Sequence, residues 1–271
     1  MFEPFFDEGL ERTSYLVACP RTREAAVIDP RRDVEIYVAA ARERGVTIRW
    51  VFQTHVHDDF ACGARELVAL GARAIVGPDA GLRYQHHYVT HGERMRIGDL
   101  SILFLHTPGH TMESTTYLLL DENGKEHAIF SGDTLFLGDV GRPDLAQKAA
   151  NMTQEDLAGI LYESLRNKIM TLPDETIVYP GHGAGSACGK NMSKETVGSV
   201  GEQKRINYAL RADMTKEEFE ALIGRYLAGK ASEAEERMID DFFAAQQKNE
   251  SADDYSITEP MWAQIERGIS P

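Results

Sequence analysis

The chain has 271 residues, 42% of them hydrophobic, which is enough to bury the core of one large domain or of one domain with an extension. Its formal net charge of −14 argues against a nuclease or another protein that binds polyanions, and favours a small substrate. No apolar run approaches the roughly 20 residues that cross a bilayer, and the first residues lack the basic segment of a secretory signal. We therefore expect a cytoplasmic protein that uses neither nucleic acid nor membrane as a partner.

Three cysteines, Cys19, Cys62 and Cys188, lie far apart in the chain, and none belongs to a CxxC pair. An odd number of widely spaced cysteines argues against a disulfide framework or a cysteine zinc knuckle. We expect reduced thiols.

Strands and helices alternate along most of the chain. Apolar runs bounded by turn residues predict strands at residues 14–18, 25–28, 48–52, 73–76, 100–105, 116–120, 127–130 and 176–179, and helices at 33–44, 64–70 and 155–167. The pair Asn123-Gly124 suits a tight hairpin, and a long polar loop is expected after Asp133. The pattern indicates two strand-rich halves with helices outside, in the α/β (α+β) class.

The chain beyond about residue 200 is predicted to be helical. Capping boxes at Thr215 and Ser232 open helices there, and an apolar stripe follows the first of them, formed by Phe219, Leu222, Ile223 and Tyr226. We divide the chain into a catalytic domain, residues 1–200, and a helical C-terminal extension, residues 201–271. The stripe is expected to pack on the domain or on a second subunit, and a homo-oligomer, a dimer or tetramer, is the expected state.

The run Thr54-His55-Val56-His57-Asp58-Asp59-Phe60 follows the predicted strand at 48–52. Two histidines at i and i+2 of an extended segment point to the same side, so both can face one metal ion. The acid Asp59 lies close behind them. The loop at the carboxyl end of this strand is therefore a candidate metal site.

Three later segments also end a predicted strand with a residue that can bind metal: His110 in T-P-G-H, Asp133 in S-G-D-T, and His182 in P-G-H-G. A lone histidine after a strand is more often structural. Four such loops in order resemble the metallo-β-lactamase superfamily, over about residues 10–185. The resemblance implies an αββα sandwich with metals on these loops.

In that superfamily the signature HxHxDH supplies two metal sites. The first falls here on His55, His57, His110 and Asp133. The second would use Asp59, His182 and a histidine at position 60, but position 60 is Phe60, which cannot bind a metal. His182 then marks a vestigial second site, and Phe60 would make that site apolar and drier. A core aromatic that only packs is the alternative, and it is compatible with this role.

The runs at 130–145 and 183–193 look like the persulfide dioxygenases, and closest to the branch often fused to a rhodanese domain. That resemblance implies one iron(II) per chain, bound by His55, His110 and Asp133, with His57 near the metal. It also implies oxidation of a low-molecular-weight persulfide, typically glutathione persulfide, by O2 and water to sulfite and free thiol. His57 and Asp59 are then candidate catalytic residues that orient ligands or handle protons. Ligand types alone do not separate iron from zinc.

An anionic thiol substrate needs local positive charge. Arg142, Lys190 and Arg205 are the candidates for binding its carboxylates, although each is equally well a solvated surface cation. Cys188 is a candidate sulfur carrier, because glycines surround it and Lys190 nearby favours an exposed thiolate. A buried, incidental cysteine is the alternative.

Three hypotheses follow. The first is the persulfide dioxygenase. The second is a hydroxyacylglutathione (thioester) hydrolase of the glyoxalase II kind, which normally needs two metals. The third is a noncatalytic sulfur-carrier or redox-sensing module built on Cys188. The chain leaves no room for a rhodanese domain of about 100 residues, so we expect any sulfurtransferase partner to be a separate protein.

Overall fold

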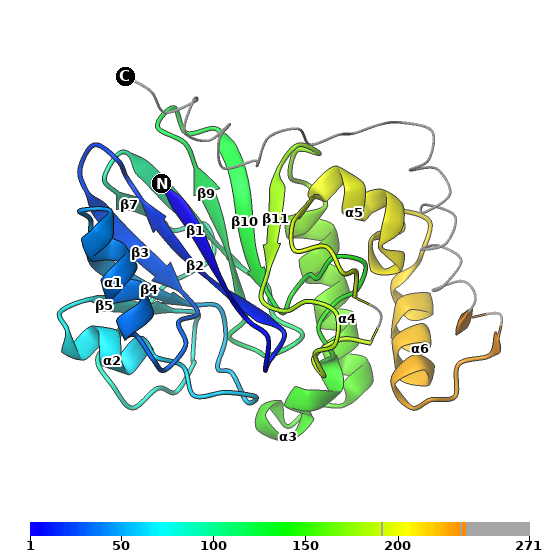
Figure 1. Cartoon of the computed structure of the whole chain (residues 1–271). Helices are drawn as coiled ribbons and strands as arrows, with labels where there is room; N and C mark the ends of the chain where they lie inside the picture. The colour runs from blue at the N-terminus through cyan, green and yellow to red at the C-terminus, as the bar shows by residue number, and fades with distance from the viewer. Residues whose placement is uncertain (191, 234, 237–271) are drawn as a thin grey trace.

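The computed structural model describes residues 1–190, 192–233, 235 and 236. Two six-stranded sheets lie face to face, with α1 and α2 outside the first sheet and α4, α5 and α6 outside the second (Figure 1). The predicted four-layer αββα sandwich is therefore confirmed.

The first sheet has the order β1-β2-β3-β4-β5-β6. Its strands are β1 (Phe2–Asp7), β2 (Arg12–Ala18), β3 (Glu24–Ile28), β4 (Thr47–Gln53), β5 (Arg73–Val76) and β6 (His86–Tyr88), and its crossover helices are α1 (Glu35–Glu43) and α2 (Ala64–Ala69). β3, β4 and β5 run parallel, which brings the end of β4 to the sheet edge where sites gather in such folds. β1 and β6 were not predicted, because β1 contains a proline and β6 is only three residues long.

The second sheet has the order β12-β11-β10-β9-β8-β7. Its strands are β7 (Arg94–Ile97), β8 (Leu100–His106), β9 (Thr115–Leu120), β10 (Glu126–Gly132), β11 (Ile177–Pro180) and β12 (Gly198–Ser199). The predicted hairpin between β9 and β10 is confirmed: Asp121 Oδ1 accepts from the backbone of Asn123 and Lys125, and Gly124 has a φ of +80°. β10 and β11 are parallel, so the loops that follow them leave the sheet on the same edge.

Aromatic residues between the two sheets hold the ends of the site-bearing strands. Tyr117 donates a hydrogen bond of 2.5 Å to the carbonyl of Gln53, the last residue of β4. Tyr15 donates one of 2.6 Å to the carbonyl of Pro180, the last residue of β11. Burial raises the pKa of both phenols, so both remain donors. These two hydrogen bonds thereby fix the ends of β4 and β11, where the loops that carry His55 and His182 begin.

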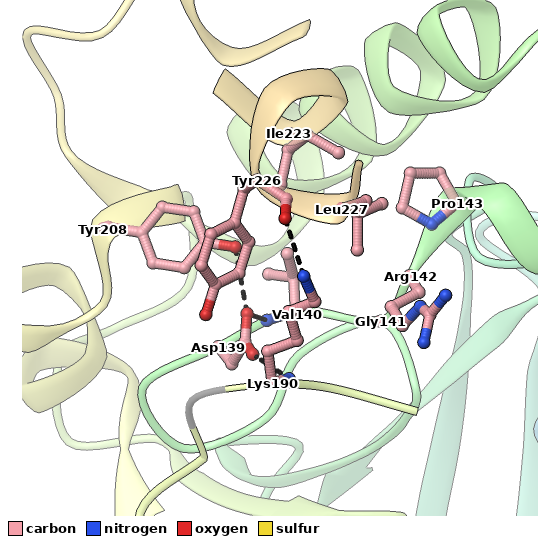
Figure 2. Close-up of a pocket in the computed structure, with 10 residues that line it drawn as sticks. All are labelled: Asp139, Val140, Gly141, Arg142, Pro143, Lys190, Tyr208, Ile223, Tyr226 and Leu227. Atoms are coloured by element: carbon pink, nitrogen blue, oxygen red, sulfur yellow. Dashed lines mark hydrogen bonds between the residues drawn. The ribbon is translucent and has the colours of Figure 1, made fainter. Parts of the chain in front are cut away.

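The predicted long loop after Asp133 is present, because no helix or strand lies between Gly132 and Pro143, but residues 131–141 are buried and not exposed as a polar loop would be. Asp139 explains why a polar sequence can be buried. Its carboxylate accepts from the Tyr208 hydroxyl at 2.9 Å and from the Lys190 backbone N–H at 2.8 Å, contacts that Figure 2 shows. Burial costs little when each polar group has a partner.

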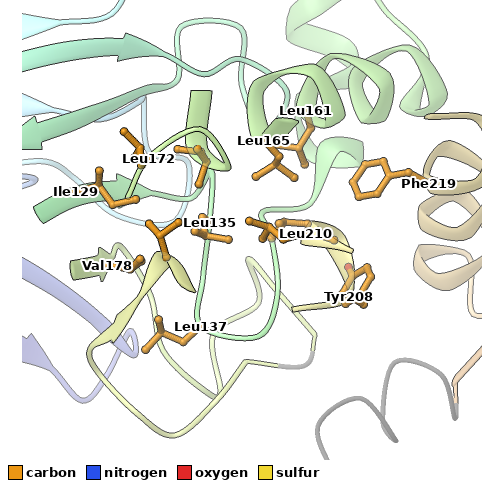
Figure 3. Close-up of a cluster of buried hydrophobic side chains, with 14 of the residues drawn as sticks. Ile129, Leu135, Leu137, Leu161, Leu165, Leu172, Val178, Tyr208, Leu210 and Phe219 are labelled. Atoms are coloured by element: carbon orange, nitrogen blue, oxygen red, sulfur yellow. The ribbon is translucent and has the colours of Figure 1, made fainter. Parts of the chain in front are cut away.

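The apolar residues of this segment complete a core cluster under the outer helices (Figure 3). Leu135 and Leu137 pack there with residues of β10, β11 and the helical layer, among them Ile129, Val178, Leu161, Leu165, Leu210 and Phe219. The helical layer consists of η1 (Pro143–Ala146), α3 (Gln147–Ala150), α4 (Gln154–Ser164), the π-helical turn η2 (Leu165–Ile169), α5 (Val200–Ile206), η3 (Tyr208–Leu210) and α6 (Lys216–Leu227).

The predicted apolar stripe lies on α6 and faces the domain. Phe219, Leu222 and Ile223 are buried in the same cluster, and the Phe219 ring lies 5.7 Å from that of Tyr162 on α4. The capping box at Thr215 is present, as is the one at Ser232. The domain boundary at residue 200 stays a prediction, and about half of the predicted extension, residues 234 and 237–271, lies outside the described residues. Among the described residues no helix has both the length and the apolar character to cross a membrane.

Candidate metal centre

Four loops that follow strands converge at one edge of the sandwich. His55 follows β4, His110 follows β8, Asp133 follows β10 and His182 follows β11. A close approach of backbone makes the convergence possible: a Cβ on Gly181 would lie 2.7 Å from Asp133 Oδ1, nearer than real contacts allow. Glycine in the P-G-H-G motif therefore lets the last two loops meet.

His55, His110 and Asp133 form one group of potential ligands. All three are buried, and their ligand atoms lie within 4.8 Å of one another. The Nε2 atoms of His55 and His110 lie 3.9 and 3.5 Å from Asp133 Oδ2. That oxygen is buried and has no hydrogen-bond partner, which is costly for a carboxylate unless a cation faces it. The residues therefore fit a metal ion.

The other nitrogen of each histidine fixes its tautomer. His110 Nδ1 lies 3.0 Å from the Arg142 carbonyl, which can only accept, so Nδ1 carries the proton. His55 Nδ1 lies 3.0 Å from Thr54 Oγ1, whose own proton goes to Asp29 Oδ2 at 2.7 Å. Both histidines thus direct an Nε2 lone pair into the site, as metal ligands do.

Electrostatics agrees with this assignment. Burial and the neighbouring His57 hold the pKa of His55 well below its usual range, so its imidazole is neutral. Burial alone would raise the pKa of Asp133, but the imidazoles of His182 and His55 hold it well below its usual range, so it is a carboxylate. Neutral imidazole and ionised carboxylate are the forms that bind metals.

His57 lies beside this group. Its Nε2 is 3.0 Å from Asp29 Oδ1, and its ring centroid is 4.1 Å from that of His55. Its Nδ1 is buried without a hydrogen-bond partner. The sequence places His57 near the metal, and the structure brings it there without including it in the three-ligand group. Asp29 holds both loop histidines, one directly and the other through Thr54.

Phe60 packs against His57 and Arg12. Its ring centroid lies 4.4 Å from that of His57 and 3.4 Å from Cζ of Arg12, whose guanidinium is fully buried. The ring covers a buried cation, which is a favourable use of an aromatic face. Of the two predicted alternatives for Phe60, the structure thus supports a packing role with a defined partner.

Asp59, His182 and Cys188 form a second group of potential ligands within 4.8 Å of one another. His182 lies between two carboxylates, with Nδ1 2.9 Å from Asp133 Oδ1 and Nε2 3.0 Å from Asp59 Oδ2. Burial alone would lower the pKa of His182, but the Asp133 and Asp59 carboxylates raise it to about 12 when no metal is present. Asp59 is exposed, so the group has an entrance from solvent.

Of the two alternatives that the sequence offers for Cys188, the structure supports the buried cysteine and not the exposed thiolate of low pKa. The residue is 3% exposed, and burial raises its pKa, although a hydrogen bond with His182 opposes this. Lys190 does not reach the thiol, because its Nζ donates to the carbonyl of Tyr226, 2.6 Å away. The glycine-rich loop folds inward instead of presenting the thiol to solvent.

The three candidate cations have different surroundings. Arg142 and Lys190 line a pocket between the segment 139–143 and α6 (Figure 2), whose walls are Asp139, Val140, Gly141, Arg142, Pro143, Lys190, Tyr208, Ile223, Tyr226 and Leu227. Arg142 forms a two-pronged ion pair with Asp144 at 2.6 and 3.1 Å. Arg205 is exposed on α5 and is not among the residues that line this pocket.

Arg12, Asp29 and Thr54 were not singled out from the sequence. Arg12 Nη2 donates to the Asp29 carbonyl at 2.9 Å, and Asp29 accepts from Thr54 through both backbone and hydroxyl. Asp29 could have been found from the sequence, because it directly follows the predicted strand 25–28, just as the other polar site residues follow predicted strands.

The fold and the three-ligand group define a metal-binding protein of the α/β class. The profile of the metallo-β-lactamase superfamily matches residues 8–182, so the chain belongs to that superfamily, and it is an enzyme of that superfamily with a histidine and aspartate metal site. The resemblance inferred from the four loops is therefore confirmed.

Relatives of two activities are similar to the chain. A hydroxyacylglutathione hydrolase of Polaromonas is 37% identical over 62% of this chain and 61% of its own length. The human mitochondrial persulfide dioxygenase ETHE1 is 28% identical over 78% of this chain and 75% of its own length. The crystal structure of ETHE1 from Myxococcus xanthus has 34% identity and a TM-score of 0.70, covering 83% of this chain and 91% of that one. The match thus covers less than two thirds of the length of the Polaromonas hydrolase, but 75% of the human ETHE1 and 91% of the Myxococcus ETHE1 chain.

Proposed function

We propose that this protein is a persulfide dioxygenase with one iron(II) per chain, held by His55, His110 and Asp133. The observation that carries the proposal is the ligand group itself: two histidines and one carboxylate whose ligand atoms lie within 4.8 Å of one another. Two histidines and one carboxylate with open positions are the set typical of iron(II) oxygenases. The similarity to ETHE1 proteins over most of both chains supports the same activity.

Iron bound there would supply the redox chemistry with O2 and an open position for the persulfide sulfur. The chain's own residues orient and protect the site. Asp29 holds His57 directly and His55 through Thr54, so both rings have fixed positions. His57 Nδ1, buried without a partner, is a group that can hold a proton near the substrate.

Asp59 is the second proposed proton-handling residue, because its carboxylate is partly buried at the entrance and linked to Asp133 through His182. Arg142 is the cation that we favour for a substrate carboxylate, since its backbone carbonyl holds His110 and the residue is one of those that line the pocket. Lys190 and Arg205 stay predictions. We also propose a cytoplasmic location, with the persulfide supplied free or by a separate sulfurtransferase.

The test is metal analysis of protein purified under nitrogen, combined with oxygen uptake on addition of glutathione persulfide. We expect about one iron per chain, and oxygen consumption that requires both iron and persulfide, with sulfite as product. Iron-loaded protein that consumes no oxygen with the persulfide would contradict the proposal.

The second candidate is a hydroxyacylglutathione hydrolase, which the 37% identity to the Polaromonas relative favours. A hydrolase of this kind would release glutathione from a hydroxyacyl thioester without oxygen. Thioester hydrolysis by the zinc-loaded chain, measured as free thiol under nitrogen, distinguishes it from the dioxygenase.

A further inference from the structure

We propose that Glu113 is a positioning residue for the metal centre, because its carboxylate ties the loop that carries His55 to the loop that carries His110. Glu113 is not a member of the three-ligand group, so it acts on the ligands through the backbone. The inference goes beyond the proposed function. It concerns how the centre is held, which matters equally for a dioxygenase and for a hydrolase.

The two loops come from different sheets. His55 follows β4 of the first sheet, and His110 follows β8 of the second. Strand pairing within either sheet therefore leaves the distance between these two ligands undetermined, and contacts between the loops must set it. Metal ligands need to be held within roughly 0.5 Å of their working positions.

Two hydrogen bonds join the loops beside the centre. The Val56 backbone N–H donates to Glu113 Oε1 at 2.8 Å, and the Thr115 backbone N–H donates to the Thr54 carbonyl at 2.8 Å. The first bond holds the peptide that lies between the two loop histidines, and the second holds the residue just before them. Only the first depends on a side chain, so Glu113 is the member of this pair that a substitution can test.

The backbone of Glu113 is itself held in place. Its carbonyl accepts from the Thr115 hydroxyl at 3.0 Å, and the carbonyl of Met112 accepts from His106 Nε2 at 2.8 Å. A Cβ on Gly77, just after β5, would lie 1.9 Å from the Glu113 carbonyl oxygen, so glycine is needed for this approach. The carboxylate therefore extends from a fixed turn, and this turn determines where its acceptor oxygen lies.

The bond from Val56 to Glu113 is of a strong kind. An ionised carboxylate that accepts from a backbone N–H forms a charge-assisted hydrogen bond, roughly twice as strong as one between neutral groups. Glu113 is partly buried, which limits competition from water. Alanine at this position would leave the Val56 N–H to solvent and release the peptide between the two histidines.

Cobalt(II) binding to the full chain, depleted of metal by a chelator under nitrogen, tests this role. Competition with a chelating dye gives the affinity, and the visible ligand-field spectrum reports the geometry around the bound cobalt. His110→Ala, which removes a ligand, identifies the cobalt that belongs to this centre. We expect Glu113→Ala to weaken that cobalt by about 10 to 100-fold, the cost typical of losing an outer partner of a metal site, and to change its spectrum.

Glu113→Gln should bind this cobalt within about threefold of the wild type and keep its spectrum, because the amide oxygen has the same reach and also accepts. Glu93→Ala is the matched control, since Glu93 also accepts a backbone N–H, that of Thr90 at 3.1 Å, but lies on neither loop. It should bind cobalt as the wild type does. Urea unfolding of the metal-free proteins shows that each variant is folded. Glu113→Asp, whose carboxylate is one methylene shorter, gives the same test if the alanine variant does not fold.

Wild-type affinity and spectrum in Glu113→Ala would overturn the proposal. A glutamine variant as weak as the alanine variant would also overturn it, because the hydrogen bond would then not be what holds the loop. Cobalt binding uses neither oxygen nor persulfide, so failure here and failure of the dioxygenase proposal are distinguishable.

Discussion

Phe60 covers the guanidinium of Arg12, with the ring centroid 3.4 Å from Cζ. Arg12 is 1% exposed, and its Nε and Nη1 have no hydrogen-bond partner, so the aromatic face is a main compensation for the buried charge. The residue that replaces an expected metal ligand thus stabilises a cation on β2, two strands away from β4 in the sheet. A change at position 60 should therefore be felt in stability as well as in metal binding.

Phe60→Leu should lower the free energy of unfolding by about 1–2 kcal/mol, because leucine keeps an apolar side chain but has no aromatic face for the Arg12 guanidinium. Urea unfolding of the metal-free chain measures the change. Phe60→Tyr keeps the ring and is the control that should remain near wild type. Equal stability of the leucine variant and the wild type would show that the ring contributes nothing to Arg12.

His55→Ala, His110→Ala and Asp133→Ala should each abolish iron retention and oxygen uptake, because each removes one of three ligands. His57→Ala should keep appreciable iron and lower the rate by about 10 to 100-fold, since this ring lies beside the ligand group. Iron content and oxygen uptake are measured on the same samples.

The His57 variant tests the three-ligand assignment most directly, because His57 lies on the metal loop and its Nδ1 is buried without a hydrogen-bond partner. If His57→Ala binds as little iron as His55→Ala, then His57 is a fourth ligand through Nδ1. The three-ligand assignment would then be wrong.

The three candidate ligands could be grouped from the sequence because each one lies in a loop that follows a recognisable strand. Arg12 and Asp29 could not be paired with the metal loop in this way. They come from β2 and the end of β3, and they meet the loop only through the antiparallel pairing of β2 with β3 and the parallel pairing of β3 with β4. Cys188 shows the same limit. Its loop looks exposed and glycine-rich, yet it folds inward onto His182, more than 120 residues from Asp59. The positions of Arg12, Asp29 and Cys188 in the site depend on tertiary contacts between distant segments, and the local sequence composition does not reveal such contacts.

Asp29→Asn should reduce stability most near neutral pH. Burial alone would raise the pKa of Asp29, but interactions with the neighbouring side chains of His57, His55 and Arg12 hold it below its usual value. An acid with a lowered pKa stabilises the fold above its unfolded pKa of about 3.9, and this contribution is lost as the pH falls through the lower native value. The stability difference between wild type and variant should therefore shrink between pH 7 and pH 3.

Urea unfolding of both metal-free proteins across that range gives the difference directly. Asparagine tolerates the left-handed backbone at this position, where φ is +48°, so the variant changes charge more than conformation. Asp58→Asn, an exposed change on the metal loop, is the control. A difference that stays constant with pH would mean that the Asp29 charge does not stabilise the fold.

Arg142→Gln should raise the KM for glutathione persulfide by about tenfold with iron content unchanged, the loss expected for one charge-assisted hydrogen bond. Arg205→Gln is the matched control, because Arg205 is exposed and outside the pocket that Arg142 lines. Steady-state oxygen uptake at varied persulfide concentration gives the KM of both variants. A larger effect from Arg205 than from Arg142 would place the substrate on the α5 side of the molecule.

Cys188→Ser should retain a substantial part of the oxygen uptake with glutathione persulfide. The thiol is buried and burial raises its pKa, so it is a poor nucleophile toward a substrate in solution. It belongs to the group with Asp59 and His182, not to the one with His55, His110 and Asp133, so its loss leaves the proposed iron ligands intact. Oxygen uptake at saturating persulfide is measured together with iron content, and Cys62→Ser, which lies outside both groups, is the control. Complete loss of activity in Cys188→Ser with iron intact would make a Cys188 persulfide an obligatory intermediate and restore its predicted role as a sulfur carrier.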